Sequence, residues 1–177
     1  MIYFTSDLHL DHTNILKLEN RPFRSLDEMV CALRDNWNKT VRDKDTVYVL
    51  GDVCLGKSGE AAYDFFSSVK GEKILVKGNH DQFLKDKNYD WNEVFSQISD
   101  YIELKYQKIR YVLFHYPIYE WRGHCKKNSI HLHGHIHSSP CDKPLCEIFS
   151  RQMYDVGVDN NGFRPVSIEH VTQKFIK

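Results

Sequence analysis

Three features are missing from this sequence, and each absence narrows the class of protein. There is no run of 18 apolar residues, and residues 1–4 lead straight into polar ones, so we expect neither a transmembrane helix nor a signal peptide. The formal net charge is +0, so the composition as a whole favours neither nucleic acid nor a membrane as a partner, and only a local basic surface remains open.

The cysteines show no pattern of a metal site or a disulfide framework. They are five in number, with no two in CxxC spacing: Cys31, Cys54, Cys125, Cys141 and Cys146. We therefore expect reduced thiols, inert in the case of Cys141 and Cys146, and a cytoplasmic protein. A chain of 177 residues can enclose one full core and is short for two, so we expect a single domain over residues 1–177.

The abundant residue is histidine, with ten in the chain and a concentration in residues 115–137. Several short apolar runs that read as strands end in histidine, carboxylate or amide side chains. These strand-end residues are Asp7, His9, Asp52, Asn79, His80, His115, His135 and His137. Hard or borderline divalent metals prefer such oxygen and nitrogen ligands. Eight groups exceed the need of one ion and fit two ions about 3.5–4 Å apart, with one carboxylate between them.

Residues 78–81, Gly-Asn-His-Asp, close the strand predicted at 74–76. The Asn79 amide oxygen can ligate a metal, while the His80 ring can reach a substrate. Asp81 can hydrogen-bond the other ring nitrogen of His80 and favour its charged form.

Residues 51–58 formally fit the phosphate-loop pattern GxxxxGK[ST] after a strand. Asp52 would place negative charge against the phosphates, and Ser58-Gly59 interrupts the helix that should follow. We therefore rank an ATP-driven protein behind the metal site.

Helical segments are predicted between the strands. Ser25 and Glu28 form a capping-box pattern ahead of an amphipathic stretch on which Trp37 belongs to the core. Residues 60–69 predict a second short helix, and residues 82–100 irregular or short helical surface structure.

The ordered motifs Asp7-x-His9, Gly51-Asp52, Gly78-Asn79-His80-Asp81, His115 and Gly134-His135-x-His137 resemble those of the calcineurin-like metallophosphoesterases. The chain is also similar to a compact bacterial and phage subgroup of that family. The residues that carry the subgroup resemblance lie at 20–23, 131–135, 156–159 and 164–165.

The resemblance implies an α/β fold, a four-layer type of sandwich of two mixed β-sheets flanked by helices. It implies one metal ion held by Asp7, His9, Asp52 and His137. A second ion would be held by Asp52, Asn79, His115 and His135, with Asp52 as the bridge. His80 then stabilises the transferring phosphoryl group or protonates the leaving oxygen, and Asp81 orients it. Hydroxide activated by the metals attacks phosphorus without a phospho-enzyme.

Further residues are candidates for the substrate pocket. A guanidinium matches phosphate bidentately, which makes Arg21 a candidate phosphate fork. The candidate residues of the substrate pocket are His12, Asn14, Arg21, Trp121, Arg122, His124, His133 and Asp159. Because His131 and His133 alternate with apolar residues, at least one of them is expected to be a buried, hydrogen-bonded histidine.

The sequence therefore predicts a dinuclear-metal hydrolase for phosphate esters, with a phosphodiester favoured over a phosphomonoester. A small, nucleotide-like substrate is favoured over a nucleic-acid duplex, because the chain has no net positive charge. Manganese is the favoured metal, with iron, zinc, nickel or cobalt as alternatives. A non-catalytic scaffold of the same fold, binding protein partners, is the alternative from another class.

Overall fold

The fold rests on two mixed β-sheets. The computed structural model describes residues 1–137 and 152–176. The first sheet has the order β4-β3-β2-β1-β9, built from β1 (Ile2–Thr5), β2 (Thr46–Val49), β3 (Glu72–Val76), β4 (Gln97–Ser99) and β9 (Val166–Ser167). Only β9 runs antiparallel to its neighbour. The second sheet has the order β5-β6-β7-β8, built from β5 (Ile102–Tyr106), β6 (Ile109–Leu113), β7 (Ser129–His133) and β8 (Met153–Asp155). Here only β5 is antiparallel.

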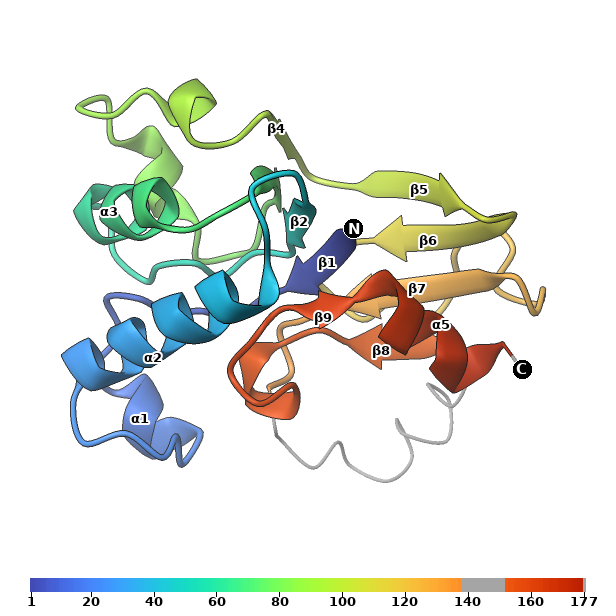
Figure 1. The fold of residues 1–177 in the computed structure, drawn as a ribbon, viewed down its shortest axis with the longest axis horizontal. Coiled ribbons are helices and arrows are strands. Elements are labelled where there is room, and N and C mark those ends of the chain that lie inside the picture. Colours follow the sequence, from blue (N-terminus) through green and yellow to red (C-terminus); the bar gives the residue numbers. More distant parts are fainter. Residues whose placement is uncertain (138–151, 177) are drawn as a thin grey trace.

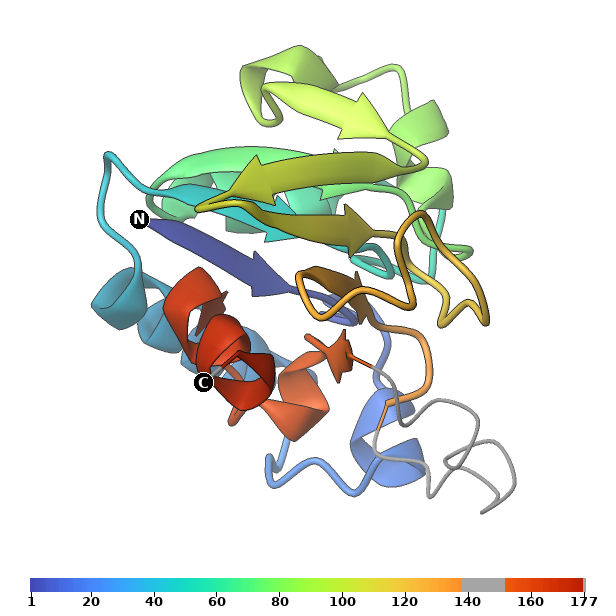
Figure 2. The same ribbon diagram turned by 90° about the vertical axis from the view of Figure 1, so that its right-hand side faces the viewer.

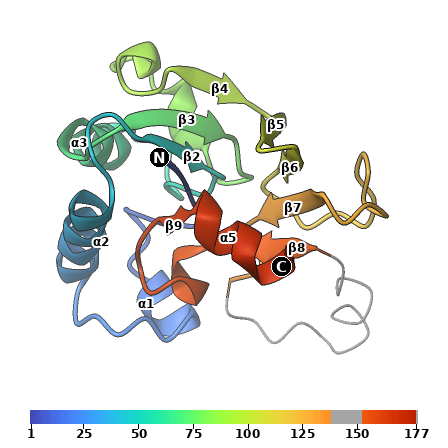
Figure 3. The same ribbon diagram turned by 45° about the vertical axis from the view of Figure 1, so that its right-hand side comes forward.

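Helices flank this pair of sheets, as expected (Figure 1). Helices α2 and α3 lie on the side of the first sheet that faces away from the second sheet (Figure 3). The helices are α1 (Ile15–Leu18), α2 (Leu26–Thr40), α3 (Glu60–Ser68) and α5 (Ile168–Phe175). Short 3-10 turns occur at Gln82–Lys85, Trp91–Glu93 and Val158–Asn160. The connection between β6 and β7 has no helix or strand (Figure 2).

Strand alternation divides the first sheet between two cores. Val47 and Val49 on β2 belong to the core shared with α2 and α3, whereas Tyr48 and Leu50 belong to the core between the sheets. Both faces of β2 are therefore covered, which explains its near-continuous apolar sequence.

The predicted helix start at Ser25 is confirmed. Its hydroxyl accepts the backbone N–H of Glu28 at 3.2 Å, while the Glu28 carboxylate accepts from the N–H of Arg24 rather than that of Ser25. Trp37 lies in the core with 1% of its surface exposed and donates its ring N–H to the Lys70 carbonyl at 2.9 Å.

Cys31, Cys54 and Cys125 are unpaired thiols, whereas Cys141 and Cys146 lie outside the described residues. Across residues 1–137 and 152–176, no helix has the length and apolar character needed to cross a membrane.

Candidate metal centre

The ends of five parallel-paired strands meet at one place. Each of β1, β2, β3, β6 and β7 ends just before one of the candidate ligands. The carboxyl ends of parallel strands lie at the same edge of a sheet, and here the two sheets bring their edges together. Backbone bonds tie the following turns to one another: Asp7 donates to the Gly51 carbonyl at 3.0 Å and Gly134 to the His115 carbonyl at 2.9 Å.

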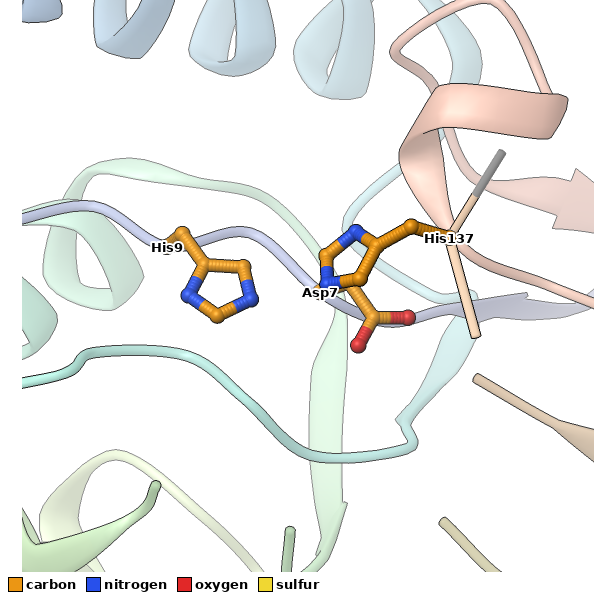
Figure 4. Close-up of side chains that lie close together, drawn as sticks. All are labelled: Asp7, His9 and His137. Atoms are coloured by element: carbon orange, nitrogen blue, oxygen red, sulfur yellow. The ribbon is translucent and has the colours of Figure 1, made fainter. Parts of the chain in front are cut away.

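The first group of ligand atoms comes from Asp7, His9 and His137. One ligand atom from each lies within 4.8 Å of the other two. Asp7 and His9 project from the segment after β1, and His137 from the segment after β7 (Figure 4). The Asp7 carboxylate is held in place by the Ser6 hydroxyl at 2.6 Å and the backbone N–H of His135 at 3.1 Å.

The second group comes from Asp52, His115 and His135, again with ligand atoms within 4.8 Å of one another. The Asn79 side-chain oxygen joins them, 3.0 Å from Nε2 of His115. Oδ1 of Asp52 accepts the backbone N–H of His80 at 3.0 Å. This carboxylate therefore connects the turn after β2 to the turn after β3.

Left-handed backbone is concentrated at this site. Positive φ angles occur at Asp7 (58°), His9 (52°), Asp52 (53°), His135 (72°) and His137 (50°). A non-glycine residue in this region is uncommon, and the strain persists only where the surrounding structure imposes it. Five of the seven candidate ligands therefore have a strained backbone conformation, and this conformation directs their side chains to one place.

The surroundings of the His9 ring show whether a cation fits at the first ligand group. The His9 side chain is 2% exposed, and neither ring nitrogen has a hydrogen-bond partner in the described part of the chain. A buried polar group without a partner is costly and calls for an explanation. A metal ion bound to one nitrogen supplies that partner, so the donor set fits a divalent cation.

The tautomers of two histidines also suit metal binding. Nδ1 of His115 lies 2.7 Å from the Leu50 carbonyl, and Nδ1 of His137 lies 2.9 Å from the Asp159 carboxylate. Each Nδ1–H thus donates to an oxygen, so Nε2 is the nitrogen that each ring would offer to a metal ion.

The charges at the site depend on one another. Burial raises the pKa of Asp7 to about 6, although the charges of His137 and His115 and the Ser6 hydroxyl oppose that shift. Burial also opposes ionisation of Asp52, yet the bond and charge of His115 and the N–H of His80 hold the pKa of Asp52 at about 2. Burial lowers the pKa of His9 to about 3, so its ring is neutral and able to ligate.

His80 lies beside the first group, with its ring centroid 5.9 Å from that of His9. The expected bond from Asp81 to the His80 ring is not found among the described residues. Instead the two Asp81 oxygens accept the backbone N–H of Gly78 at 2.7 Å and of Val53 at 2.8 Å. Asp81 therefore fixes the turn that carries Asn79 and His80 through these backbone bonds.

The interpretation of Arg21 as a phosphate fork is wrong, because its guanidinium is already fully used. It donates to both Asp159 oxygens at 2.8 Å and to the carbonyls of Asp7 and Leu8 at 2.7 and 3.0 Å. Asp159 in turn accepts from His137. Arg21 and Asp159 are thus buried supports of Asp7 and His137, and the guanidinium has no face left for a phosphate.

The loop after His115 lies along the second sheet. Trp121 is 7% exposed, donates to the Ser129 hydroxyl at 3.1 Å and packs 5.3 Å from the His131 ring. His124 lies against the Trp121 carbonyl at 3.2 Å. Arg122 is exposed and lines a cavity near the start of β6 and β7. The structure does not bring these three residues to the ligand groups, since the ligands follow the opposite ends of those strands.

Of the remaining pocket candidates His12, Asn14 and His133, His12 lies beside a candidate ligand. The His12 ring is 5.4 Å from His9, whereas Asn14 is exposed at the start of α1. His133 is buried, with Nδ1 3.0 Å from the Gly134 carbonyl. His131 is fully buried with both ring nitrogens against carbonyl oxygens, so the expectation of a buried, hydrogen-bonded histidine in this pair is confirmed.

The phosphate-loop interpretation does not hold in the structure. The backbone N–H groups of Leu55 and Gly56 donate to the Asp11 carboxylate at 2.6 and 2.7 Å. A side-chain carboxylate therefore takes the place that a phosphate would need, and α3 begins only at Glu60.

Sequence reasoning missed three residues that support the ligands. Besides Ser6, these are Asp155 and Asn160: Asn160 donates to the Asp155 carboxylate at 2.9 Å and to the His137 carbonyl at 2.7 Å. Asp155 ends β8 next to β7, and an acidic residue at a further strand end was the signal available.

The chain is similar to several known proteins. The chain is 33% identical over 173 residues to the uncharacterized protein MJ1445 of Methanocaldococcus jannaschii, covering 97% of this chain and 89% of that protein. It is 36% identical over 81 residues to the Gene 66 protein of Mycobacterium phage L5, covering 45% of this chain and 39% of the phage protein.

The crystal structure of AQ665, a protein of unknown function from Aquifex aeolicus, has a similar fold. The TM-score is 0.77 at 28% identity, and 98% of each chain is covered. A sequence profile described as calcineurin-like phosphoesterase matches residues 1–139, which include every candidate metal ligand. The chain belongs to the calcineurin-like phosphoesterase family.

Proposed function

We propose that this protein hydrolyses phosphate esters at two divalent metal ions held by the two ligand groups. The observation that carries the proposal is the pair of clusters, Asp7–His9–His137 and Asp52–His115–His135, at the meeting point of the two sheets. As the family resemblance implies, Asp52 would be the ligand that both ions share: it belongs to the second cluster, and it accepts the backbone N–H of His80, whose ring lies beside His9 of the first.

The metal ions, when bound, neutralise the phosphate charge and lower the pKa of water to near neutrality. The chain's own part is positioning. His80 hydrogen-bonds the phosphoryl oxygens or gives its proton to the leaving oxygen, since its half-buried ring lies beside His9. Asp81 keeps that ring in place through the Gly78 backbone.

A phosphodiester with a small, nucleotide-like substituent is the substrate that we favour. The net charge of +0 supports a small substrate over a polyanionic duplex. Manganese is the metal that we favour, because the ligand set combines carboxylate, amide and imidazole groups without thiolate. Iron, zinc, nickel and cobalt accept the same ligands.

The test compares metal-free and Mn²⁺-loaded protein on bis-p-nitrophenyl phosphate and p-nitrophenyl phosphate. We expect diester turnover that requires the metal and falls at least a hundredfold in His80→Ala. His170→Ala, an exposed histidine on α5, is the matched control and keeps full turnover. Turnover of the monoester alone would overturn the diester preference.

The alternative is a scaffold that keeps the fold for protein partners. A scaffold needs neither the strained ligand backbone nor His80. Two bound metal ions with no turnover of either ester would favour the scaffold over the enzyme.

A further inference from the structure

A row of three aromatic side chains leads outward from the second ligand group. The ring of Tyr116 lies 4.6 Å from that of His135 and 5.0 Å from that of His115. Phe114 follows at 5.6 Å from Tyr116, and Tyr101 at 6.4 Å from Phe114. Tyr116 and Tyr101 are 37% and 43% exposed, so both offer aromatic surface to a ligand.

The sheet fixes the position of this row. Phe114 donates its N–H to the Leu132 carbonyl at 3.2 Å, and the Tyr116 carbonyl lies 3.0 Å from Nε2 of the buried His131. Phe114 and Tyr116 flank the candidate ligand His115 just after the end of β6 (Ile109–Leu113). The aromatic surface is therefore as firmly placed as the candidate ligand between them.

Two of these residues, Phe114 and Tyr116, line a cavity that adjoins the turn carrying His80. The cavity measures about 550 Å³, within the range of small-molecule sites. Gly78 and Asp81, which flank Asn79 and His80, line it as well. A phosphate ester centred on the two ligand groups can thus place one of its substituents in this cavity.

The rest of the lining includes the apolar Leu84 and several polar side chains. The polar ones include Lys77, which is paired with Asp100 at 2.7 Å, and Gln82, which accepts from Lys85 at 2.6 Å. An aliphatic substituent would cover these polar groups without hydrogen-bonding to them, and that is costly. A planar heterocycle offers a π-face to the rings and a hydrogen-bonding edge to the polar side chains.

We propose that this cavity binds the base of a nucleotide substrate, with Tyr116 and Phe114 as the stacking residues. The inference rests on the phosphoesterase function proposed above and names its substrate class. Tyr116 is a specificity residue here: it binds the base and takes no part in the chemistry at phosphorus.

The experiment measures binding, so that it does not depend on turnover. Calorimetry with the Mn²⁺-loaded His80→Ala protein compares AMP with ribose 5-phosphate, which lacks the base. We expect AMP to bind about tenfold more tightly, because stacking of a base on an aromatic ring is worth roughly 5- to 150-fold in affinity.

Three further substitutions in the same background assign the preference to the ring. Tyr116→Leu should remove the preference for AMP. Tyr116→Phe should keep this preference, because the ring and not the hydroxyl stacks on the base. Tyr119→Leu is the matched control: Tyr119 is 63% exposed and does not line the cavity, so the preference should persist.

Equal affinity for the two ligands in the parent protein, binding of neither, or a preference that survives Tyr116→Leu would each overturn the proposal. If AMP binds more tightly than ribose 5-phosphate but the wild type turns over no ester, the phosphoesterase proposal is refuted and the base site is not. Ester turnover by the wild type without a base preference would refute the base site alone.

Discussion

The guanidinium of Arg21 holds the carboxylate of Asp159 through two parallel hydrogen bonds of 2.8 Å, although the two residues are 138 positions apart. Both side chains are almost completely buried, with 0% and 2% exposed. The same carboxylate accepts from Nδ1 of His137, so the pair sets the direction of a candidate metal ligand. Arg21 also donates to the backbone carbonyls of Asp7 and Leu8. It therefore joins the turn after β1 to Asp159 in the turn after β8 and, through Asp159, to His137.

Replacing Asp159 should weaken metal binding without removing any ligand. Asp159→Asn takes away the negative charge that fixes the His137 tautomer, and such supporting changes typically cost 10- to 100-fold in metal affinity. Competition with a chromophoric chelator measures the loss. Asp35→Asn, an exposed carboxylate on α2, is the control. Unchanged affinity in Asp159→Asn would contradict the role assigned to this carboxylate.

Replacing Arg21 should destabilise the fold. Arg21→Met leaves Asp159 buried and without its cation, a change that costs roughly 3–5 kcal/mol. Urea denaturation measures it, with Arg24→Met at an exposed position expected within about 0.5 kcal/mol of wild type. The double variant Arg21→Met/Asp159→Asn should be more stable than the sum of the single changes, because no unpaired charge remains. Strict additivity would show that the two groups are not coupled.

Gly134 tests how closely the two sheets approach at the site. A Cβ at this position would meet the Ser6 hydroxyl and the Asp7 carboxylate, neither of which can move without losing its bonds. Gly134→Ala should therefore cost roughly 1–3 kcal/mol of stability and also weaken metal binding. At Gly162 a Cβ meets only the Arg164 side chain at 4.0 Å, so Gly162→Ala carries the strain of its φ of 62° alone and keeps full metal affinity. Equal metal affinity in the two variants would contradict the close approach.

Asp155 should make stability depend on pH. Burial raises its pKa to about 6, so the folded protein keeps a proton that the unfolded chain has lost between pH 4 and 6. The contribution of this carboxyl to stability is therefore greatest in acid and falls as the pH rises through 6. Relative to wild type, metal-free Asp155→Asn should gain about 1–2 kcal/mol between pH 5 and pH 7.5. Urea titrations at both values measure this gain, and a stability difference independent of pH would contradict it.

The candidate ligands were predictable from the sequence because each follows a strand, and strand ends are set by local apolar patterns. The roles of Arg21 and Asp159 were not, since they depend on a contact across 138 positions that no local pattern reveals. Trp121 was predicted to belong to a binding loop. Its actual partners, Ser129 and His131, lie on the next strand, so its local sequence does not reveal that it is buried.

Three strands were not predicted. β9 (Val166–Ser167) has only two residues, and the other two differ in their sequence signal. β4 (Gln97–Ser99) is too short to show alternation, and it pairs with β3 at the edge of the first sheet. β5 (Ile102–Tyr106) alternates between half-buried and exposed positions, so its sequence carries the period of two that is typical of a strand.

The central claim is a phosphoesterase site for two metal ions, and a titration tests it most directly. Mn²⁺ is added stepwise to metal-free protein while hydrolysis of bis-p-nitrophenyl phosphate is followed. The two clusters predict that activity rises until two ions are bound per chain and then stays constant. Saturation at one ion per chain would contradict the dinuclear site, and no turnover at any metal loading would contradict the proposed enzyme.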